Sequence, residues 1–124
     1  MADSNPYGST VLEHFRRPRN QGAMPDASAS AEGVNPLCGD RVRVALMLDA
    51  SGMITDARFV ANACAICVAS ASLLTERVRG FSRDVAAALS DEDVLGLIGE
   101  PVPAARRRCA TLPLEALRRA LTGQ

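Results

Sequence analysis

The chain has 124 residues, 48% of them hydrophobic and 23% charged, and its 14 acidic and 14 basic side chains give a formal net charge of zero. This length and composition predict one folded domain over residues 1–124, with a flexible start at residues 1–6. With no net positive charge, three Phe, one Tyr and no Trp, the chain lacks what binding to phosphates and bases requires, so nucleic acid is excluded as a partner.

The first ten residues are polar and carry a single charge, at Asp3, so they lack the basic start and apolar stretch of a secretory signal. No apolar run approaches the roughly 20 residues that a membrane-spanning helix needs. The sequence therefore predicts a cytoplasmic protein without a membrane partner. Cytosolic thiols are kept reduced, so the four cysteines indicate metal binding, catalysis or burial before disulfides.

The first half of the chain predicts one short helix and a β-hairpin. A helix over residues 9–17 ends before Pro18, and the Gly-, Ala-, Ser- and Pro-rich segment 20–35 is expected to be a loop in which one short edge strand can form. Residues 41–48 alternate in character, which predicts a strand with one aliphatic face. After a turn, residues 53–60 return as an antiparallel strand whose alternation is less regular.

The second half predicts four helices joined by short connections. The predicted segments are 65–79, 83–89, 91–98 and a last helix from about Leu112. Ser82 and Ser90 are the expected N-caps of the two short helices. Thr111 is the expected cap of the last helix, with Pro113 in its first turn, where a missing N–H costs nothing.

The residues that can carry chemistry are cysteines in or beside predicted loops and helix starts. Cys38 lies in a Pro- and Gly-containing loop two residues before Asp40, so a thiolate and a carboxylate can reach one point. Cys64 opens the long helix and Cys109 precedes the last one, and a helix N-terminus favours the thiolate. The arginines at 106–108 are expected to lower the pKa of Cys109 further, well below about 8.5.

Three thiolates, from Cys38, Cys64 and Cys109, and the carboxylate of Asp40 form a set that suits tetrahedral zinc or an iron–sulfur cluster with one weak oxygen ligand. Other interpretations stay open. Each cysteine can instead be a buried apolar side chain, most of all Cys67, which falls on the apolar stripe of its helix. Cys64 and Cys67 can also form a dithiol redox pair, but that leaves the other two cysteines unexplained.

Several motifs occur along the chain in a fixed order. They are residues 13–22 (EHFRRPRNQG), 35–40 (NPLCGD), 57–59 (ARF), 64–66 (CAI) with 69–72 (ASAS), and 108–112 (RCATL). On these motifs the chain, from about Tyr7 to Leu121, resembles the IscU/SufU/NifU family of iron–sulfur cluster assembly scaffolds.

The resemblance implies an α+β fold of the SufE/NifU type, with a small antiparallel sheet of about three strands packed against helices. It implies that Cys38, Asp40, Cys64 and Cys109 bind a transient [2Fe-2S] cluster or Zn²⁺. It also implies that a cysteine desulfurase delivers persulfide sulfur to one of the three cysteines, and that the cluster passes to apo iron–sulfur recipient proteins. The chain is thus expected to be a scaffold or carrier. If it is enzymatic, it is a SufU-like zinc-dependent sulfurtransferase that stimulates the desulfurase.

The chain departs from the family pattern at several places. The IscU branch has a histidine just before its last cysteine; this chain has Arg108 there and in this respect resembles the SufU branch. The SufU branch, however, carries an insertion between its second and third cysteines, for which this chain has no room. Ala63 replaces a family glycine, and residues 102–106 replace the stretch that binds the chaperone in IscU. Cys67 lies outside the pattern, either as a core residue or as a thiol that resolves a persulfide on Cys64.

Overall fold

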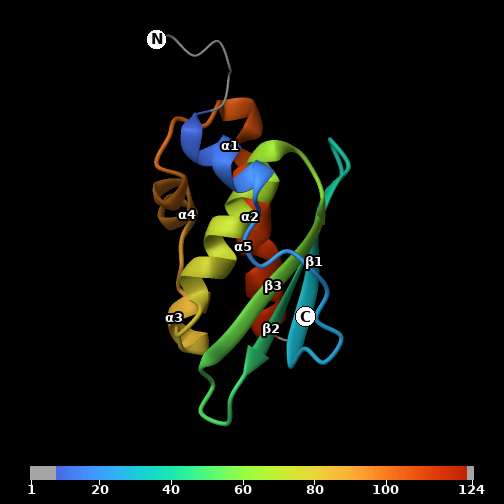
Figure 1. Ribbon diagram of the computed structural model, residues 1–124, viewed down its shortest axis with the longest axis vertical. Helices are drawn as coiled ribbons and strands as arrows, with labels where there is room; N and C mark the ends of the chain where they lie inside the picture. The colour runs from blue at the N-terminus through green and yellow to red at the C-terminus, as the bar shows by residue number, and fades with distance from the viewer. Residues whose placement is uncertain (1–7, 123–124) are drawn as a thin grey trace.

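The computed structural model describes residues 8–122, so the expected flexibility of residues 1–6 lies outside the described part. Figure 1 shows a sheet on one side of the molecule with helices behind and beside it, which is the expected α+β fold. The elements in chain order are α1 (Ser9–Arg16), β1 (Ala29–Asn35), β2 (Asp40–Leu48), β3 (Ile54–Asn62), α2 (Ala65–Val78), α3 (Arg83–Ala87), α4 (Asp91–Ile98), the 3-10 turn η1 (Ala104–Arg106) and α5 (Arg107–Thr122). Within residues 8–122, no helix has the length and apolar character needed to span a membrane.

β2 is the central strand of a three-stranded antiparallel sheet in the order β1-β2-β3. Its Val42, Val44 and Leu46 are buried on one face, as their alternation predicted. β1 pairs with β2 along its whole length and is a full edge strand, longer than the short strand expected in the segment 20–35. Its weak strand propensity is offset by this pairing and by α5, which packs along it.

The irregular alternation of β3 comes from a β-bulge. The pairing of β2 with β3 shifts by one residue between Met47 and Leu48, which leaves Thr55 as an extra residue. The extra residue changes the side-chain parity, so that Ile54 shares the buried face with Phe59. Both side chains are fully buried, and the hairpin keeps one continuous apolar face.

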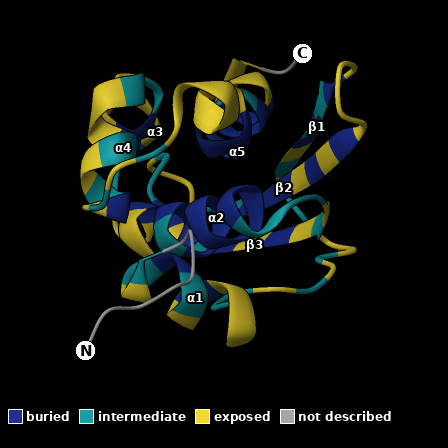
Figure 2. Cartoon of the chain, turned by 90° about the horizontal axis from the view of Figure 1, so that it is seen from above, coloured by how far each residue is buried: buried dark blue, intermediate teal, exposed yellow. Residues whose placement is uncertain are grey.

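Two helices bury the inner face of the sheet. α5 packs along β1 and β2, α2 packs against β3, and the two helices contact each other. Figure 2 shows α5 with its buried face turned inward and its exposed face outward, whereas α2 is buried along most of its length. α1 packs across α2, and α4 packs against both α2 and α5. Ser82 and Ser90 cap α3 and α4 as predicted, and Ser90 forms a full capping box with Asp93.

The last helix begins earlier than predicted. It starts at Arg107 and continues directly from η1, which follows Pro103. Thr111 and Pro113, expected at the cap and in the first turn, therefore lie inside α5. Pro113 cannot donate to the carbonyl four residues earlier, that of Cys109. The helix continues through this position because its inner face is buried against the rest of the protein, so tertiary packing outweighs the local signal.

Two close contacts fix the start of α5. A Cβ added at Gly33 of β1 would stand 3.1 Å from the carbonyl oxygen of Leu112, so the strand and the helix backbone approach closely only because the residue is glycine. On the other side, Ser70 Oγ of α2 donates to the carbonyl oxygen of Ala110 at 2.5 Å in a buried interface. Both contacts lie within one helical turn of Cys109, whose position they help to set.

Replacing Ser70 with alanine is expected to lower the free energy of unfolding by about 1 kcal/mol, because the buried carbonyl of Ala110 loses its side-chain donor. Urea unfolding followed by circular dichroism measures the change. The exposed Ser30 of β1 offers the control, since its alanine variant is expected to change stability by less than about 0.5 kcal/mol. Equal losses in the two variants would contradict the role given to Ser70.

Candidate metal centre

The loop between β1 and β2 is shaped by the buried Asn35. Its side-chain oxygen accepts a hydrogen bond from the N–H of Leu37 at 3.2 Å. Its carbonyl accepts from the N–H groups of Cys38 at 3.3 Å and of Gly39 at 2.8 Å. Gly39 has a φ of 79°, in the left-handed region that glycine adopts without strain. These contacts form a tight turn that leaves Cys38 exposed at the end of the sheet.

Asp40 is the first residue of β2 and lies on the same buried face of the strand as Val42. Only 8% of the residue is exposed. Among residues 8–122, its Oδ2 is buried without a hydrogen-bond partner. Because an unpaired buried carboxylate oxygen costs roughly 1–3 kcal/mol or more, Asp40 is poised to accept a cation.

The structure brings together predicted ligands that lie far apart in the sequence. The Sγ atoms of Cys38 and Cys109 and a carboxylate oxygen of Asp40 all lie within 4.8 Å of one another. Cys64, the N-cap of α2, lies outside this 4.8 Å group but borders it, close enough to raise the pKa of the Cys109 thiol. The residues come from the β1–β2 loop, the β3–α2 junction and the first turn of α5, which meet at the upper end of Figure 1.

The expectation that Cys109 has a lowered pKa is wrong. Burial raises the pKa of its thiol to about 12, and hydrogen bonding and charge from Cys64 and hydrogen bonding to Asp40 act in the same direction. The interaction with Arg106 opposes these effects but is the smallest of them. Desolvation of the thiolate therefore outweighs both the helix N-terminus and the neighbouring arginines.

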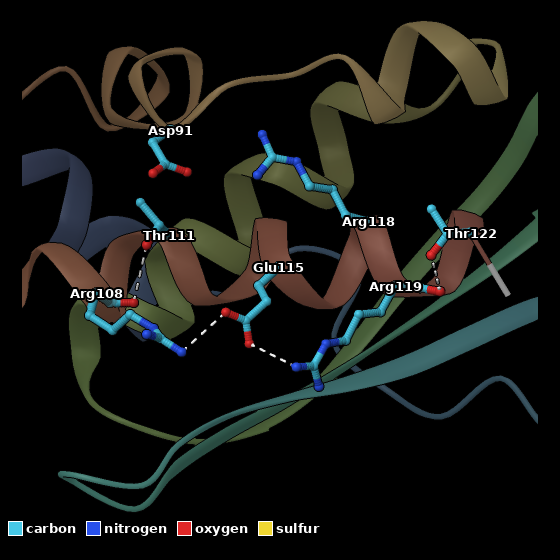
Figure 3. A pocket seen from close by; sticks show the side chains of 7 residues that line it. All are labelled: Asp91, Arg108, Thr111, Glu115, Arg118, Arg119 and Thr122. Carbon is cyan, nitrogen blue, oxygen red and sulfur yellow. Dashed lines mark hydrogen bonds and ion pairs between the residues drawn. The ribbon is translucent and has the colours of Figure 1, made fainter. Parts of the chain in front are cut away.

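Two arginines beside the site are paired with carboxylates. Arg107 Nη2 lies 2.9 Å from Glu92 Oε2, and Arg108 Nη2 lies 3.1 Å from Glu115 Oε1. Figure 3 shows Arg108, Glu115 and Arg119 as a chain of ion pairs along α5, lining a surface depression of about 340 Å³. The side chains that line this depression include none of the cysteines, so it is separate from the thiol site.

Cys67 is completely buried, three residues after Cys64 in the first turn of α2. Burial raises the pKa of its thiol, and Cys64, Asp40, Cys109 and Cys38 raise it further. The Cys67 thiol thus lies within electrostatic range of all four predicted ligands. The sequence signalled this only weakly, through the Cys-x-x-Cys spacing.

His14, the only histidine in the sequence, has a structural role in the contact between α1 and α2. Its Nδ1 lies 2.7 Å from Ser72 Oγ in the buried contact between α1 and α2. The same Ser72 hydroxyl accepts a hydrogen bond from the backbone N–H of Arg19 at 2.8 Å. Desolvation lowers the pKa of His14, with Arg19 acting in the same direction. His14 therefore ties α1 to α2 as a neutral side chain and is not part of the donor group in the described chain.

The donor set fits a thiophilic metal. Thiolates are the ligands that zinc and the irons of iron–sulfur clusters prefer, and one carboxylate completes a set of four. A cation would also give the unpaired Oδ2 of Asp40 a partner, and would favour the thiolate form of Cys109, which burial disfavours without metal.

A three-stranded antiparallel sheet packed against helices, with Cys38, Asp40 and Cys109 gathered at one end, makes this a small α+β domain with a candidate metal site. The family model described as "NifU-like N terminal domain" matches residues 6–123. The chain belongs to this family, which includes the IscU, SufU and NifU proteins.

Curated relatives carry NifU, SufU and IscU names. The bifunctional protein NifU/MnmA of Rubrobacter xylanophilus is 39% identical, but the match covers 92% of this chain and only 23% of that protein. The zinc-dependent sulfurtransferase SufU of Bacillus subtilis is 33% identical, covering 90% of this chain and 86% of SufU. The iron–sulfur cluster assembly scaffold protein IscU of Escherichia coli K12 is 32% identical, covering 93% of this chain and 91% of IscU.

Solved structures show the same fold. The crystal structure of FiSufU from Fervidobacterium islandicum AW-1 superposes with a TM-score of 0.78 and 21% identity. The match covers 93% of this chain and 96% of that one. The expected small antiparallel sheet with packed helices is therefore confirmed.

The burial of the thiols predicts the order in which they react in the metal-free protein. At pH 8, iodoacetamide is expected to modify Cys38 first, because it is exposed, and Cys109 last together with Cys67, because burial keeps both protonated. Mass spectrometry of tryptic peptides after timed alkylation gives the order. Modification of Cys109 as fast as Cys38 would show that its pKa is not raised.

Proposed function

We propose that this chain is an iron–sulfur cluster assembly scaffold. It accepts sulfur from a cysteine desulfurase on Cys38, Cys64 or Cys109, and assembles a labile [2Fe-2S] cluster that it passes to apo recipient proteins. The cluster's ligands are Cys38, Asp40, Cys64 and Cys109. The observation that carries the proposal is the convergence of Cys38, Asp40 and Cys109 within 4.8 Å, with Cys64 beside them and Asp40 Oδ2 unpaired.

A ligand set of three thiolates and one carboxylate suits a cluster that must be released to another protein. A carboxylate holds iron less tightly than a thiolate, so Asp40 supplies a ligand that exchanges readily. Cys38 lies on an exposed turn, while Cys109 is buried at the start of α5. The site therefore has one side open to a recipient and one side fixed by the fold.

The open side also suits a protein partner. Leu37, next to Cys38, is 95% exposed, so an apolar side chain stands free beside a candidate sulfur acceptor. A desulfurase that docks here would cover Leu37 and reach Cys38 and the partly exposed Cys64. The expected setting is the cytoplasm, where thiols stay reduced.

The second candidate function is that of a zinc-dependent sulfur acceptor that stimulates a cysteine desulfurase. The same four residues would hold Zn²⁺, which takes tetrahedral sets of sulfur and oxygen ligands. Two observations favour it: the similarity to SufU along most of both chains, and Arg108 in the place of a histidine. Arg108 is ion-paired with Glu115 and contributes no ligand.

Anaerobic reconstitution with iron, cysteine and a cysteine desulfurase tests the scaffold function. The protein is expected to gain the visible absorption of a [2Fe-2S] cluster, and the Cys38→Ala and Cys109→Ala variants are expected to lose most of it, because each removes a thiolate ligand. Failure of correctly folded wild-type protein to gain the cluster counts against the scaffold.

The role of Asp40 can be separated from general charge effects. Asp40→Asn is expected to weaken Zn²⁺ binding by about tenfold or more, because an anionic ligand becomes neutral while its shape is kept. Competition with a chromogenic chelator measures the affinity. Asp26→Asn, an exposed carboxylate in the loop before β1, serves as the matched control and is expected to bind as wild type does. Equal affinities of the two variants would remove Asp40 from the ligand set.

Metal content of freshly purified protein, measured beside desulfurase stimulation, distinguishes the two candidate functions. Tightly held zinc at one ion per chain, together with faster sulfur release from cysteine by the desulfurase, would favour the sulfur acceptor. Protein without zinc that gains a cluster on reconstitution would favour the scaffold.

A further inference from the structure

The proposed function leaves Cys67 without a role, although its thiol lies behind the site. The side chain is 0% exposed and belongs to the core cluster against which Cys64 packs. All four proposed ligands act on it electrostatically, and after burial itself Cys64 acts most strongly. A free thiol so placed offers chemistry that an apolar side chain of similar size does not.

The start of α2 sets the geometry of Cys64 and Cys67. Cys64 is the N-cap, and its carbonyl accepts the first helical hydrogen bond, from the N–H of Val68 at 3.0 Å. Cys67 is therefore the third helical residue, the position whose side chain reaches back to the N-cap residue in a capping box. Cα atoms three residues apart in a helix are about 5 Å apart, within the roughly 4.4–6.8 Å that a disulfide spans.

We propose that Cys67 resolves a persulfide on Cys64, displacing the outer sulfur as hydrogen sulfide directly at the metal site. This inference rests on the proposed function, because it requires that Cys64 receives sulfur there. It gives Cys67 a catalytic role in sulfur delivery that is separate from metal binding.

The step balances without an added electron donor. The bond between Cys64 Sγ and the outer sulfur breaks, and a bond between Cys64 Sγ and Cys67 Sγ forms. The proton of the buried Cys67 thiol passes to the outer sulfur in the same step, so Cys67 never stands as a free thiolate. The electron pair of the broken bond leaves with the outer sulfur, which departs as hydrogen sulfide. Cys67 is oxidised and the outer sulfur is reduced. A small dithiol reductant then restores both cysteines for another turnover.

Cys64 and Cys67 differ in solvent exposure, and this difference gives the two thiols different roles. Cys64 is partly exposed at a helix N-terminus, so a sulfur donor can reach it from outside. Cys67 has no access to solvent and meets only a sulfur carried on a neighbouring residue. Hydrogen sulfide released between them appears next to Cys38, Asp40 and Cys109, where the proposed iron ligands gather. While the disulfide lasts, Cys64 cannot act as a ligand, so its reduction precedes completion of a cluster.

The sequence makes the step easy to follow by mass. All 14 basic residues are arginines, and trypsin gives a peptide of residues 59–77 that contains Cys64 and Cys67 and no other cysteine. Metal-free wild-type protein and the Cys67→Ala and Cys67→Ser variants are treated anaerobically with inorganic tetrasulfide and freed of excess reagent. Released hydrogen sulfide and the mass of this peptide are then measured over time without reductant.

Wild-type protein is expected to convert the Cys64 persulfide into a Cys64–Cys67 disulfide and to release one hydrogen sulfide per disulfide formed. Both variants are expected to keep the persulfide about tenfold longer, because no thiol displaces the outer sulfur. The serine variant keeps the size of the side chain, and circular dichroism checks that each variant is folded. A persulfide of equal lifetime in folded wild type and variant overturns the proposal, as does a disulfide from Cys64 to Cys109.

Failure of this inference differs from failure of the proposed function. Wild-type protein that assembles a cluster from iron and inorganic sulfide, yet keeps its Cys64 persulfide, overturns the role of Cys67 alone. Wild-type protein that assembles no cluster, yet releases hydrogen sulfide with a Cys64–Cys67 disulfide, overturns the scaffold and supports the role of Cys67.

Discussion

The packing of α5 along the sheet is the interaction on which the site depends. Gly33 lets β1 approach the helix backbone at Leu112, and Ser70 ties α2 to the carbonyl of Ala110. Together these contacts place Cys109 beside Asp40, which the strand alternation has already turned to the buried face. Two segments distant in the sequence, the β1–β2 loop with the start of β2 and the start of α5, thus supply donors within 4.8 Å of one another because α5 packs along the sheet, and Cys64 borders this group.

The same packing makes unfavourable contributions to the free energy of folding at this site. Asp40 Oδ2 is buried without a partner, and the thiols of Cys109 and Cys67 have raised pKa values because their charged forms are desolvated. Polar groups kept in such surroundings are characteristic of functional sites, where part of the folding energy holds them in place. A cation at this site would relieve these contributions, so its binding would stabilise this end of the molecule.

Local signals predicted most of the fold, and tertiary packing overruled them at two places. Ser82 and Ser90 lie at the caps they were expected to form, because a cap depends on a few neighbouring residues. Pro113 was a misleading sign of a helix start, since burial along the sheet carries α5 through it. β1 was underestimated because its pairing with β2 and its contact with α5 form only in the folded molecule.

The sequence by itself determined the kinds of donor and their local settings: a thiol and a carboxylate two residues apart around a glycine turn, and thiols at the starts of two helices. The tertiary structure decided how close these donors lie, because distances between chain-distant residues are set by packing. It also decided the direction of the Cys109 pKa, since desolvation depends on which elements cover a group rather than on its neighbours in sequence. For the same reason, only the folded chain shows that the Cys67 thiol is closed to solvent and lies within electrostatic range of the four proposed ligands.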